Sequence, residues 1–217
     1  MHRHWLAVAA ICAGSTVAFG QSFEATISGG ESLFNGSSAN LGTTGADPTS
    51  AQYKMNDGFR LTFRMAINSW RFLGHEFGYS YNHTSINVPA TTSVGIGLPG
   101  QTGGTVQTPA QNLSVPIHQG FYDFLAYATP EGTHVRPFVC AGVQFSSFFP
   151  PGTSAYYGNQ TTKFGFNYGG GLKVRVTSIW GVRLDYRQYN TSKPFDFPNQ
   201  KGRLMQTEAS VGISFNM

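Results

Sequence analysis

Apolar and polar residues alternate along many short stretches of this chain, and no stretch after residue 20 repeats its apolar residues at the 3.6-residue period of a helix. Between Phe59 and Ile67, for example, the odd positions hold Phe, Leu, Phe, Met and Ile, whereas the even positions hold Arg, Thr, Arg and Ala. This period of two predicts strands with one apolar and one polar face. We expect eight such strands: Phe23–Leu33, Phe59–Ile67, Phe72–Thr84, Ile117–Ala128, Val135–Ser146, Lys163–Val176, Trp180–Arg187 and Met205–Phe215.

The connections between these strands are alternately short and long. Ser69–Arg71, Thr129–His134 and Thr177–Ile179 are short, whereas Phe34–Asn56 and Pro89–Pro116 are long and rich in Gly, Ser, Thr, Asn and Pro. Eight antiparallel strands can close into a barrel, and this alternation is typical of barrels with short periplasmic turns and long outer loops. We therefore predict an all-β fold, an eight-stranded antiparallel up-and-down transmembrane β-barrel, with no separate hydrophobic core among its long loops.

The first 20 residues have the pattern of a secretory signal peptide. His2, Arg3 and His4 precede an apolar run, and Ala18-Phe19-Gly20 offers small residues at a cleavage site. The domains expected are thus a signal peptide at 1–20 and an outer-membrane β-barrel at 21–217. Removal of the signal peptide leaves Cys140 as the one cysteine, so an intramolecular disulfide is excluded.

Composition narrows the function classes. Only 11% of residues are charged and 14% are aromatic, whereas soluble domains average about 25% charged residues and disordered chains contain few aromatic residues. A mean hydropathy of −0.18 excludes a bundle of transmembrane helices. The net charge of +4 comes without a cluster of Lys and Arg, so no nucleic-acid partner is expected.

Glycine positions indicate which face of the barrel is inside. Alternation alone would also suit a soluble barrel with an apolar lumen. Six glycines, however, lie on the same face of their strands as the charged residues, because they occupy the same odd or even positions. A narrow lumen needs small residues more than a water-facing surface does. We therefore expect the polar face inside and the apolar face in lipid. These glycines are Gly74, Gly78, Gly165, Gly169, Gly171 and Gly181.

Two sets of candidate site residues follow from this orientation. Aromatic residues near strand ends are expected to form interface girdles: Trp70, Trp180 and Phe215 at the periplasmic boundary, with Tyr79, Tyr81, Tyr186 and Tyr189 toward the opposite ends of their strands. Charged residues facing inward must pair or stay hydrated, because a lone buried charge is costly. The expected lumen charge network comprises Arg60, Arg64, Glu76, Asp123, Lys173, Arg175, Arg183, Asp185, Arg187 and Glu208.

Four segments carry a resemblance to a known family: Arg136–Val143, Phe166–Leu172, Trp180–Arg187 and Val211–Phe215. On these residues the chain resembles the outer-membrane β-barrel family of the OmpA-like, eight-stranded type. The resemblance implies residence in the bacterial outer membrane, with outer-membrane lipid around the wall. It also implies the barrel assembly machinery as a partner during insertion. The motifs are short and indicate a barrel rather than an activity.

Three functions remain open from the sequence. The first is a non-enzymatic structural or surface-interaction role, with the lumen filled by ion pairs and the extracellular loop partner unknown. The second is a narrow porin-like channel for ions or small solutes. The third is a lipid-modifying enzyme, for which His83 and Ser85 form a His-x-Ser pair without a suitable downstream carboxylate. We expect no catalytic residues, no metal site, no cofactor and a monomeric protein.

Overall fold

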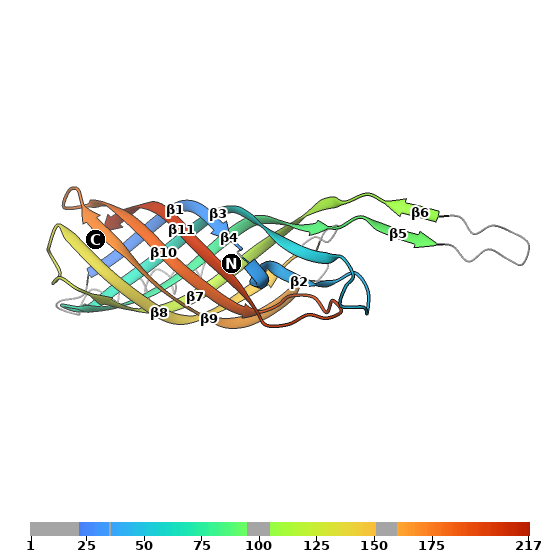
Figure 1. The fold of residues 1–217 in the computed structure, drawn as a ribbon. Coiled ribbons are helices and arrows are strands. Elements are labelled where there is room, and N and C mark those ends of the chain that lie inside the picture. Colours follow the sequence, from blue (N-terminus) through green and yellow to red (C-terminus); the bar gives the residue numbers. More distant parts are fainter. Residues whose placement is uncertain (1–21, 35, 95–104, 151–159) are drawn as a thin grey trace, which may run out of the picture.

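Eight long antiparallel strands form a closed ring in the computed structural model, which describes residues 22–34, 36–94, 105–150 and 160–217 (Figure 1). The predicted signal peptide lies outside the described residues. The prediction of an eight-stranded barrel is confirmed. The strands of the ring are β1 (Ser22–Leu33), β3 (Gln52–Trp70), β4 (Leu73–Val88), β7 (Gln111–Tyr127), β8 (Val135–Phe148), β9 (Thr161–Arg175), β10 (Trp180–Ser192) and β11 (Arg203–Asn216).

The first and last strands of the ring close the barrel. Their order is β1-β11-β10-β9-β8-β7-β4-β3, and β1 pairs again with β3. Ile27 lies opposite Ile213 on one side and opposite Phe63 on the other. Closure gives every strand of the wall two neighbours, which removes the exposed edges through which open sheets aggregate.

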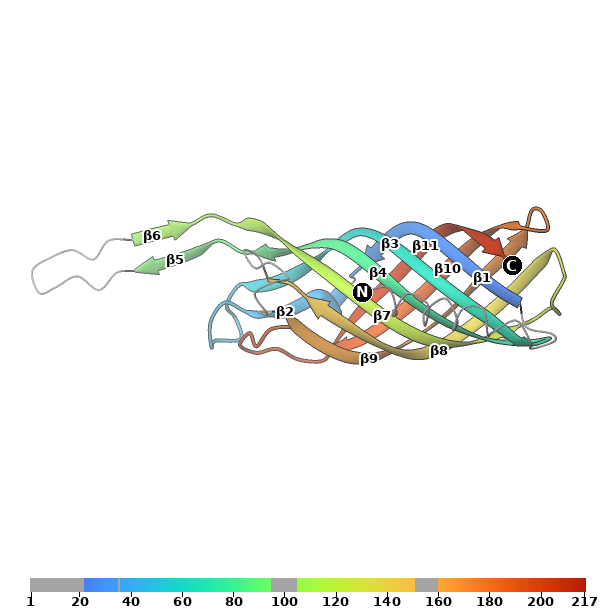
Figure 2. The ribbon, with the colours of Figure 1, turned by 180° about the vertical axis from the view of Figure 1, so that it is seen from behind.

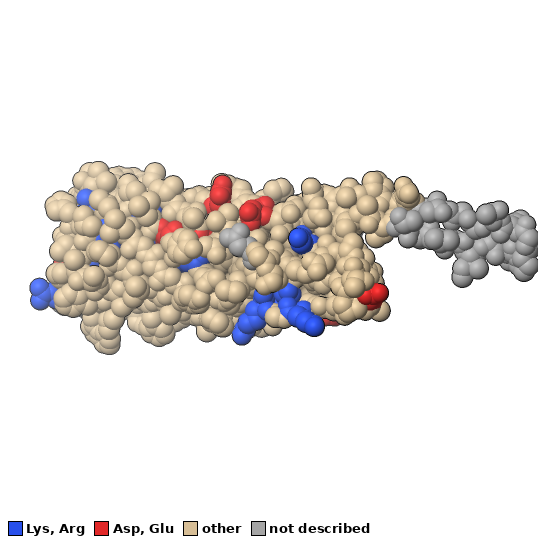
Figure 3. Space-filling view, in the orientation of Figure 1, with Lys and Arg blue, Asp and Glu red and all other residues tan. Residues whose placement is uncertain are grey.

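Burial alternates along each strand as the sequence pattern predicted. On β10, Val182, Leu184 and Tyr186 are exposed, whereas Arg183 and Arg187 are fully buried. The apolar face is therefore outside and the polar face inside, as the glycine positions indicated. In Figure 3 most of the visible barrel wall is uncharged. Within the described ranges, no helix is long and apolar enough to cross a membrane.

Lumen glycines make room for two aromatic rings that also point inward. A side chain at Gly78 would collide with the ring of Phe121, and one at Gly171 would meet the ring of Phe138 at 2.8 Å. Both rings are at most 5% exposed. The lumen is consequently not purely polar: the small residues on its wall let bulky rings fill the space between charged groups.

The outer ends of several strands run further than the alternation predicted. β3 begins at Gln52, β4 continues to Val88 and β7 begins at Gln111, so parts of the predicted long loops are strand. Regular cross-strand pairing of β4 with β7 continues as far as Val88 and Gln111. Beyond it, β5 (Thr91–Val94) pairs with β6 (Thr105–Thr108), and this hairpin projects well beyond the barrel (Figure 2).

A hydrophobic cluster fills the outer end of the barrel. It is not a separate loop core, because most of its members belong to the barrel strands, but the sequence analysis did not predict that loop residues would pack there. The 3₁₀ turn η1 (Gly36–Ala39) and β2 (Asn40–Thr43) fold back onto β3. Apolar residues from this segment and from the β10–β11 connection then meet inward-facing residues of the wall, which no single stretch of sequence reveals. This outer cluster comprises Phe34, Ala39, Leu41, Met55, Ile86, Val115, Ile117, Phe148 and Leu204, with Tyr53, Val88, Phe195 and Phe197 packed against it.

Candidate functional site

Charged side chains from seven strands meet inside the barrel and form what we call the ionic layer. Within the described residues it contains five cations and five anions that pair with one another. Nearly all are withdrawn from solvent; Lys173 is the most exposed, at 7%. The members are Arg60, Arg64, Lys173, Arg183 and Arg187 with Glu24, Glu76, Asp123, Asp185 and Glu208.

Glu76 lies at the centre of the ionic layer. Its carboxylate accepts hydrogen bonds from Arg183 Nη1 at 2.5 Å and from Arg187 Nη2 at 2.6 Å. Arg64 Nε lies 3.6 Å away. Three guanidinium groups therefore depend on one carboxylate. Asp185 is a second acceptor for two of these arginines. It accepts hydrogen bonds from Arg183 Nε at 2.8 Å and from Arg187 Nε at 3.0 Å.

Pairing in the ionic layer spans the bore. Glu76 on β4 and Arg183 on β10 stand four strands apart in a ring of eight, on opposite walls. Lys173 Nζ on β9 reaches Glu24 on β1 at 2.8 Å, three strands away. Arg187 on β10 reaches Asp123 on β7 at 2.6 Å across the same distance. Charge pairs that cross the bore occupy its cross-section. Pairs formed along one wall would leave the cross-section free.

Glu208 and Arg60 connect the ionic layer to a second set of polar side chains nearer the outer end. Glu208 accepts from Tyr189 at 2.7 Å and pairs with Arg64 and Arg60. Arg60 in turn donates to Gln119 at 2.6 Å. Gln119 donates to Gln206 at 2.7 Å from the opposite wall, since β7 and β11 stand four strands apart. We call this set the amide layer: Asn82, Gln119, Gln144 and Gln206.

The structure places nine of the ten predicted lumen charges in the ionic layer and moves one out of it. Arg175 is only half-buried, at the end of β9 next to the short β9–β10 turn, and it makes no ion pair among the described residues. The alternation of residues correctly placed Arg175 on the inner face of β9, but it did not indicate how far along the barrel axis the residue lies. Arg175 is the last residue of its strand, so its side chain reaches the mouth of the barrel rather than its middle.

Two residues in direct contact with the predicted lumen charges, Glu24 and Tyr189, were not predicted there, and the amides of the amide layer were not predicted as a group. Glu24 is the partner of Lys173, and its position on the polar face of β1 was a usable signal. Tyr189 is not a girdle residue: it is 1% exposed and lies under the guanidinium of Arg60, 4.3 Å from the ring centre. It has the same parity as Arg183 and Arg187, so the alternation itself contained the correct assignment.

The remaining girdle candidates lie on the outside of the wall. Trp70, Trp180 and Tyr186 are more than half exposed, and Tyr79 is 48% exposed. The rings of Trp180 and Phe215 are 5.3 Å apart, on paired ends of β10 and β11. Tyr81 packs against the outward-facing His118. The aromatic residues are therefore free to contact lipid headgroups at the two ends of the wall.

The residues of the enzyme alternative do not assemble into a catalytic group. The Ser85 hydroxyl accepts a hydrogen bond from Asn56 at 3.0 Å. In the part of the chain that the structure describes, no hydrogen bond or ion pair joins His83 to Ser85 or to a carboxylate. Clusters of His, Cys, Asp and Glu suited to a metal ion are also absent from the described residues.

Comparisons with known proteins agree with this architecture. OprG of Pseudomonas aeruginosa is 12% identical with a TM-score of 0.55, over 89% of this chain and 95% of that one. The N-terminal barrel of OprF from the same organism is 11% identical with a TM-score of 0.50, over 90% and 97%. Neisserial surface protein A is 12% identical with a TM-score of 0.50, over 90% and 96%. At such identities the likeness shows the fold alone.

No curated protein matches the sequence. The family described as outer membrane protein beta-barrel domain, in contrast, matches residues 6–216, nearly the whole chain. The apolar outer wall, the closed ring of eight strands and the polar interior are those of a barrel that resides in the bacterial outer membrane. The chain belongs to the outer membrane protein beta-barrel domain family.

Proposed function

We propose that this protein is a closed, non-enzymatic barrel that anchors an extracellular contact surface in the outer membrane. The observation that carries the proposal is the balanced ionic layer, in which five cations and five anions, among the residues described, pair across the bore. Because the ionic layer is balanced and each of its members is paired, it avoids the cost of lone buried charges and leaves little attraction for a permeating ion.

Three layers in series support a closed bore. The ionic layer lies in the middle of the barrel, the amide layer follows it, and the outer cluster fills the outer end. The outer cluster is apolar and buried, so an ion crossing it would lose its hydration shell without gaining a partner. These layers favour a structural role over the alternative of a narrow channel.

The long hairpin supports the surface-contact part of the proposal. Residues 77–122, which run from inside β4 through β5 and β6 into β7, contain no Asp, Glu, Lys or Arg. Their outer portion leaves the barrel as a ribbon whose tip strands, β5 and β6, pair only with each other among the described elements (Figure 1). An isolated two-stranded ribbon is only marginally stable by itself. It would gain stability, and main-chain hydrogen bonds, from a partner surface.

Electrical measurement tests the closed bore. The wild-type protein reconstituted in a planar bilayer is expected to show no steady conductance above that of the lipid. Glu208→Ala should also stay at this baseline, because the amide layer and the outer cluster remain in series beyond it. Insertion is verified by the gel shift between unheated and heated samples, and a sixteen-stranded porin is the positive control. Steady conductance by the wild-type protein, with a selectivity that Glu208→Ala changes, would favour the channel.

Removal of the ribbon tests the contact surface. Replacing residues 91–108 by Asn-Gly, a two-residue sequence that suits a tight hairpin turn, should leave a barrel that inserts and keeps its gel shift. We expect bacteria that produce the wild-type protein to self-aggregate and adhere more than cells without it, and bacteria that produce the shortened variant to lose this excess. Arg175→Gln, which alters the opposite end of the barrel, is the matched control. Adhesion that is the same for the wild-type protein, the shortened variant and cells without the protein would count against the proposal.

A further inference from the structure

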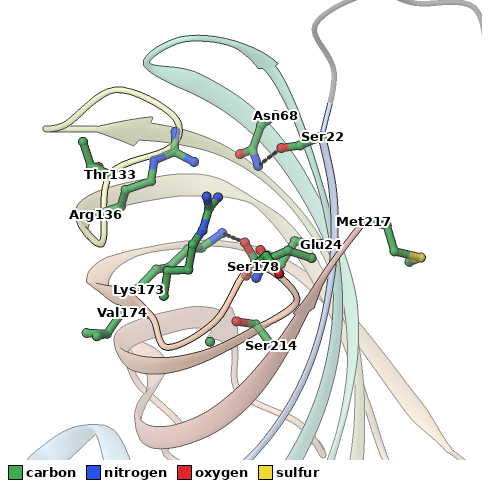
Figure 4. Close-up of a pocket in the computed structure, with 13 residues that line it drawn as sticks. Ser22, Glu24, Asn68, Thr133, Arg136, Lys173, Val174, Ser178, Ser214 and Met217 are labelled. Carbon is green, nitrogen blue, oxygen red and sulfur yellow. Dashed lines mark hydrogen bonds and ion pairs between the residues drawn. The ribbon is translucent and has the colours of Figure 1, made fainter.

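A cavity of about 160 Å³ opens at the end of the barrel that carries the short turns (Figure 4). Its wall includes three cationic residues, Arg136, Lys173 and Arg175, together with Glu24. Asn68, Ser178 and Ser214 add amide and hydroxyl groups. We call it the mouth cavity. In an outer-membrane barrel with short periplasmic turns, this end faces the periplasm.

Arg136 is a buried cation without a carboxylate. It is 6% exposed, and its guanidinium lies 3.6 Å from the ring centre of Tyr127. One nitrogen, Nη2, makes a long contact of 3.5 Å to the carbonyl oxygen of Arg71, and Nε has no hydrogen-bond partner. No ion pair joins Arg136 to any described carboxylate. The Tyr127 ring compensates this charge in part, and an anion that reached the guanidinium from the cavity would supply the missing ion pair.

The charges around Arg136 do not compensate it. Glu24 is paired with Lys173 at 2.8 Å, and the rest of the ionic layer is balanced within itself. Arg175, half-buried on the same cavity, has no carboxylate partner among the described residues either. Glu131 accepts a hydrogen bond from Ser22 on the cavity wall, and the C-terminal residue Met217 also lines the cavity, but neither carboxylate forms an ion pair with Arg136 or Arg175. The mouth cavity therefore carries two arginines without an ion-pair partner among the described residues.

We propose that the mouth cavity binds a small oxyanion of the phosphate type. A guanidinium presents parallel N–H groups that match the oxygens of phosphate, which makes arginine the preferred partner for such anions. The Ser178 and Ser214 hydroxyls also line the mouth cavity and can donate further hydrogen bonds (Figure 4). One water needs about 10–15 Å³, so 160 Å³ accommodates an oxyanion with several waters.

The anion enters and leaves on the periplasmic side. Lys173 and Glu24 line the inner end of the cavity and belong to the ionic layer, which separates the cavity from the outer end of the bore. The site is thus a pocket that opens to the periplasm and is closed at its inner end, rather than the entrance of a pore. Its occupant is either a free periplasmic phosphate or the phosphate of a lipid headgroup in the adjacent leaflet, two sources with the same chemistry.

Calorimetric titration of the full-length mature barrel with sodium phosphate tests the site. The protein is held in a non-ionic detergent at constant ionic strength, with sodium chloride replaced stepwise. We expect one saturable site in the wild-type protein. Arg136→Gln should weaken its affinity at least tenfold, and Arg175→Gln should weaken it about three- to tenfold. Arg203→Gln, an exposed change at the opposite end of the barrel, should leave the affinity unchanged.

Several outcomes would overturn the proposal. The first is the absence of saturable phosphate binding by the wild-type protein. The second is a phosphate affinity of the Arg136→Gln and Arg175→Gln variants equal to that of the wild-type protein. The third is a loss of phosphate affinity in Arg203→Gln as large as that in Arg136→Gln. If Arg136→Gln fails to fold, the half-buried Arg175 still provides the test. Repeating the titration in phosphatidylcholine vesicles with and without phosphatidylglycerol identifies the source. Phosphate binding that anionic lipid abolishes assigns the site to a headgroup, and binding that persists assigns it to a free anion.

Discussion

Glu76→Gln is expected to lower the free energy of unfolding in lipid vesicles by about 3–5 kcal/mol, the cost of breaking a buried ion pair by removing one partner. The substitution keeps the shape of the side chain and removes its charge. It leaves Arg183 and Arg187 with Asp185 as their chief shared partner and turns an amide N–H₂ group toward guanidinium donors. The measurement is urea-induced unfolding followed by tryptophan fluorescence.

Glu31→Gln is the matched control for that experiment. Glu31 is an exposed glutamate on the outer face of β1 without an ion pair among the described residues, so the same chemical change breaks no ion pair and should not lower stability. A Glu76→Gln variant as stable as Glu31→Gln would mean that water screens the ionic layer. The bore would then be hydrated, and the argument for closure would rest on the outer cluster.

Leu184→Arg is expected to destabilise the barrel in lipid by about 2–4 kcal/mol, the cost of arginine on the lipid face at the bilayer midplane. Leu184 is 47% exposed on the outer face of β10, four residues beyond the interface residue Trp180. Its side chain therefore lies well inside the apolar band. The readout is reversible unfolding in vesicles of defined thickness.

Val176→Arg serves as the depth control, because Val176 is 64% exposed but follows the last residue of β9 at the short turn. Near the interface the same arginine costs only about 0–1 kcal/mol. Equal effects at the two positions would show that Leu184 is not at mid-bilayer depth. A silent Leu184→Arg would contradict the placement of the apolar face in lipid.

The sequence by itself determined the wall of the barrel. The alternation of apolar and polar residues indicates which side chains share a face of a strand. This inference needs only the geometry of an extended chain. It was enough to predict nine of the ten charges of the ionic layer, including Glu76, Asp185 and Glu208. The parity of the glycines then indicated which face was inside, because only a narrow interior requires so many small residues. Tyr189 obeyed the same rule, although we expected it among the outer tyrosines.

Only the tertiary structure decided depth, partners and the filling of the outer end. Parity carries no information about height along the barrel axis, so it grouped Arg175 at the mouth with Arg183 in the middle. Pairing across the bore depends on which strands face each other after closure, and for this reason Glu24 became the partner of Lys173. The outer cluster joins Leu41, Ile86 and Phe195 from distant segments. Apolar loop residues find a core only when closure brings them over the same opening, because burial depends on proximity in space rather than along the chain.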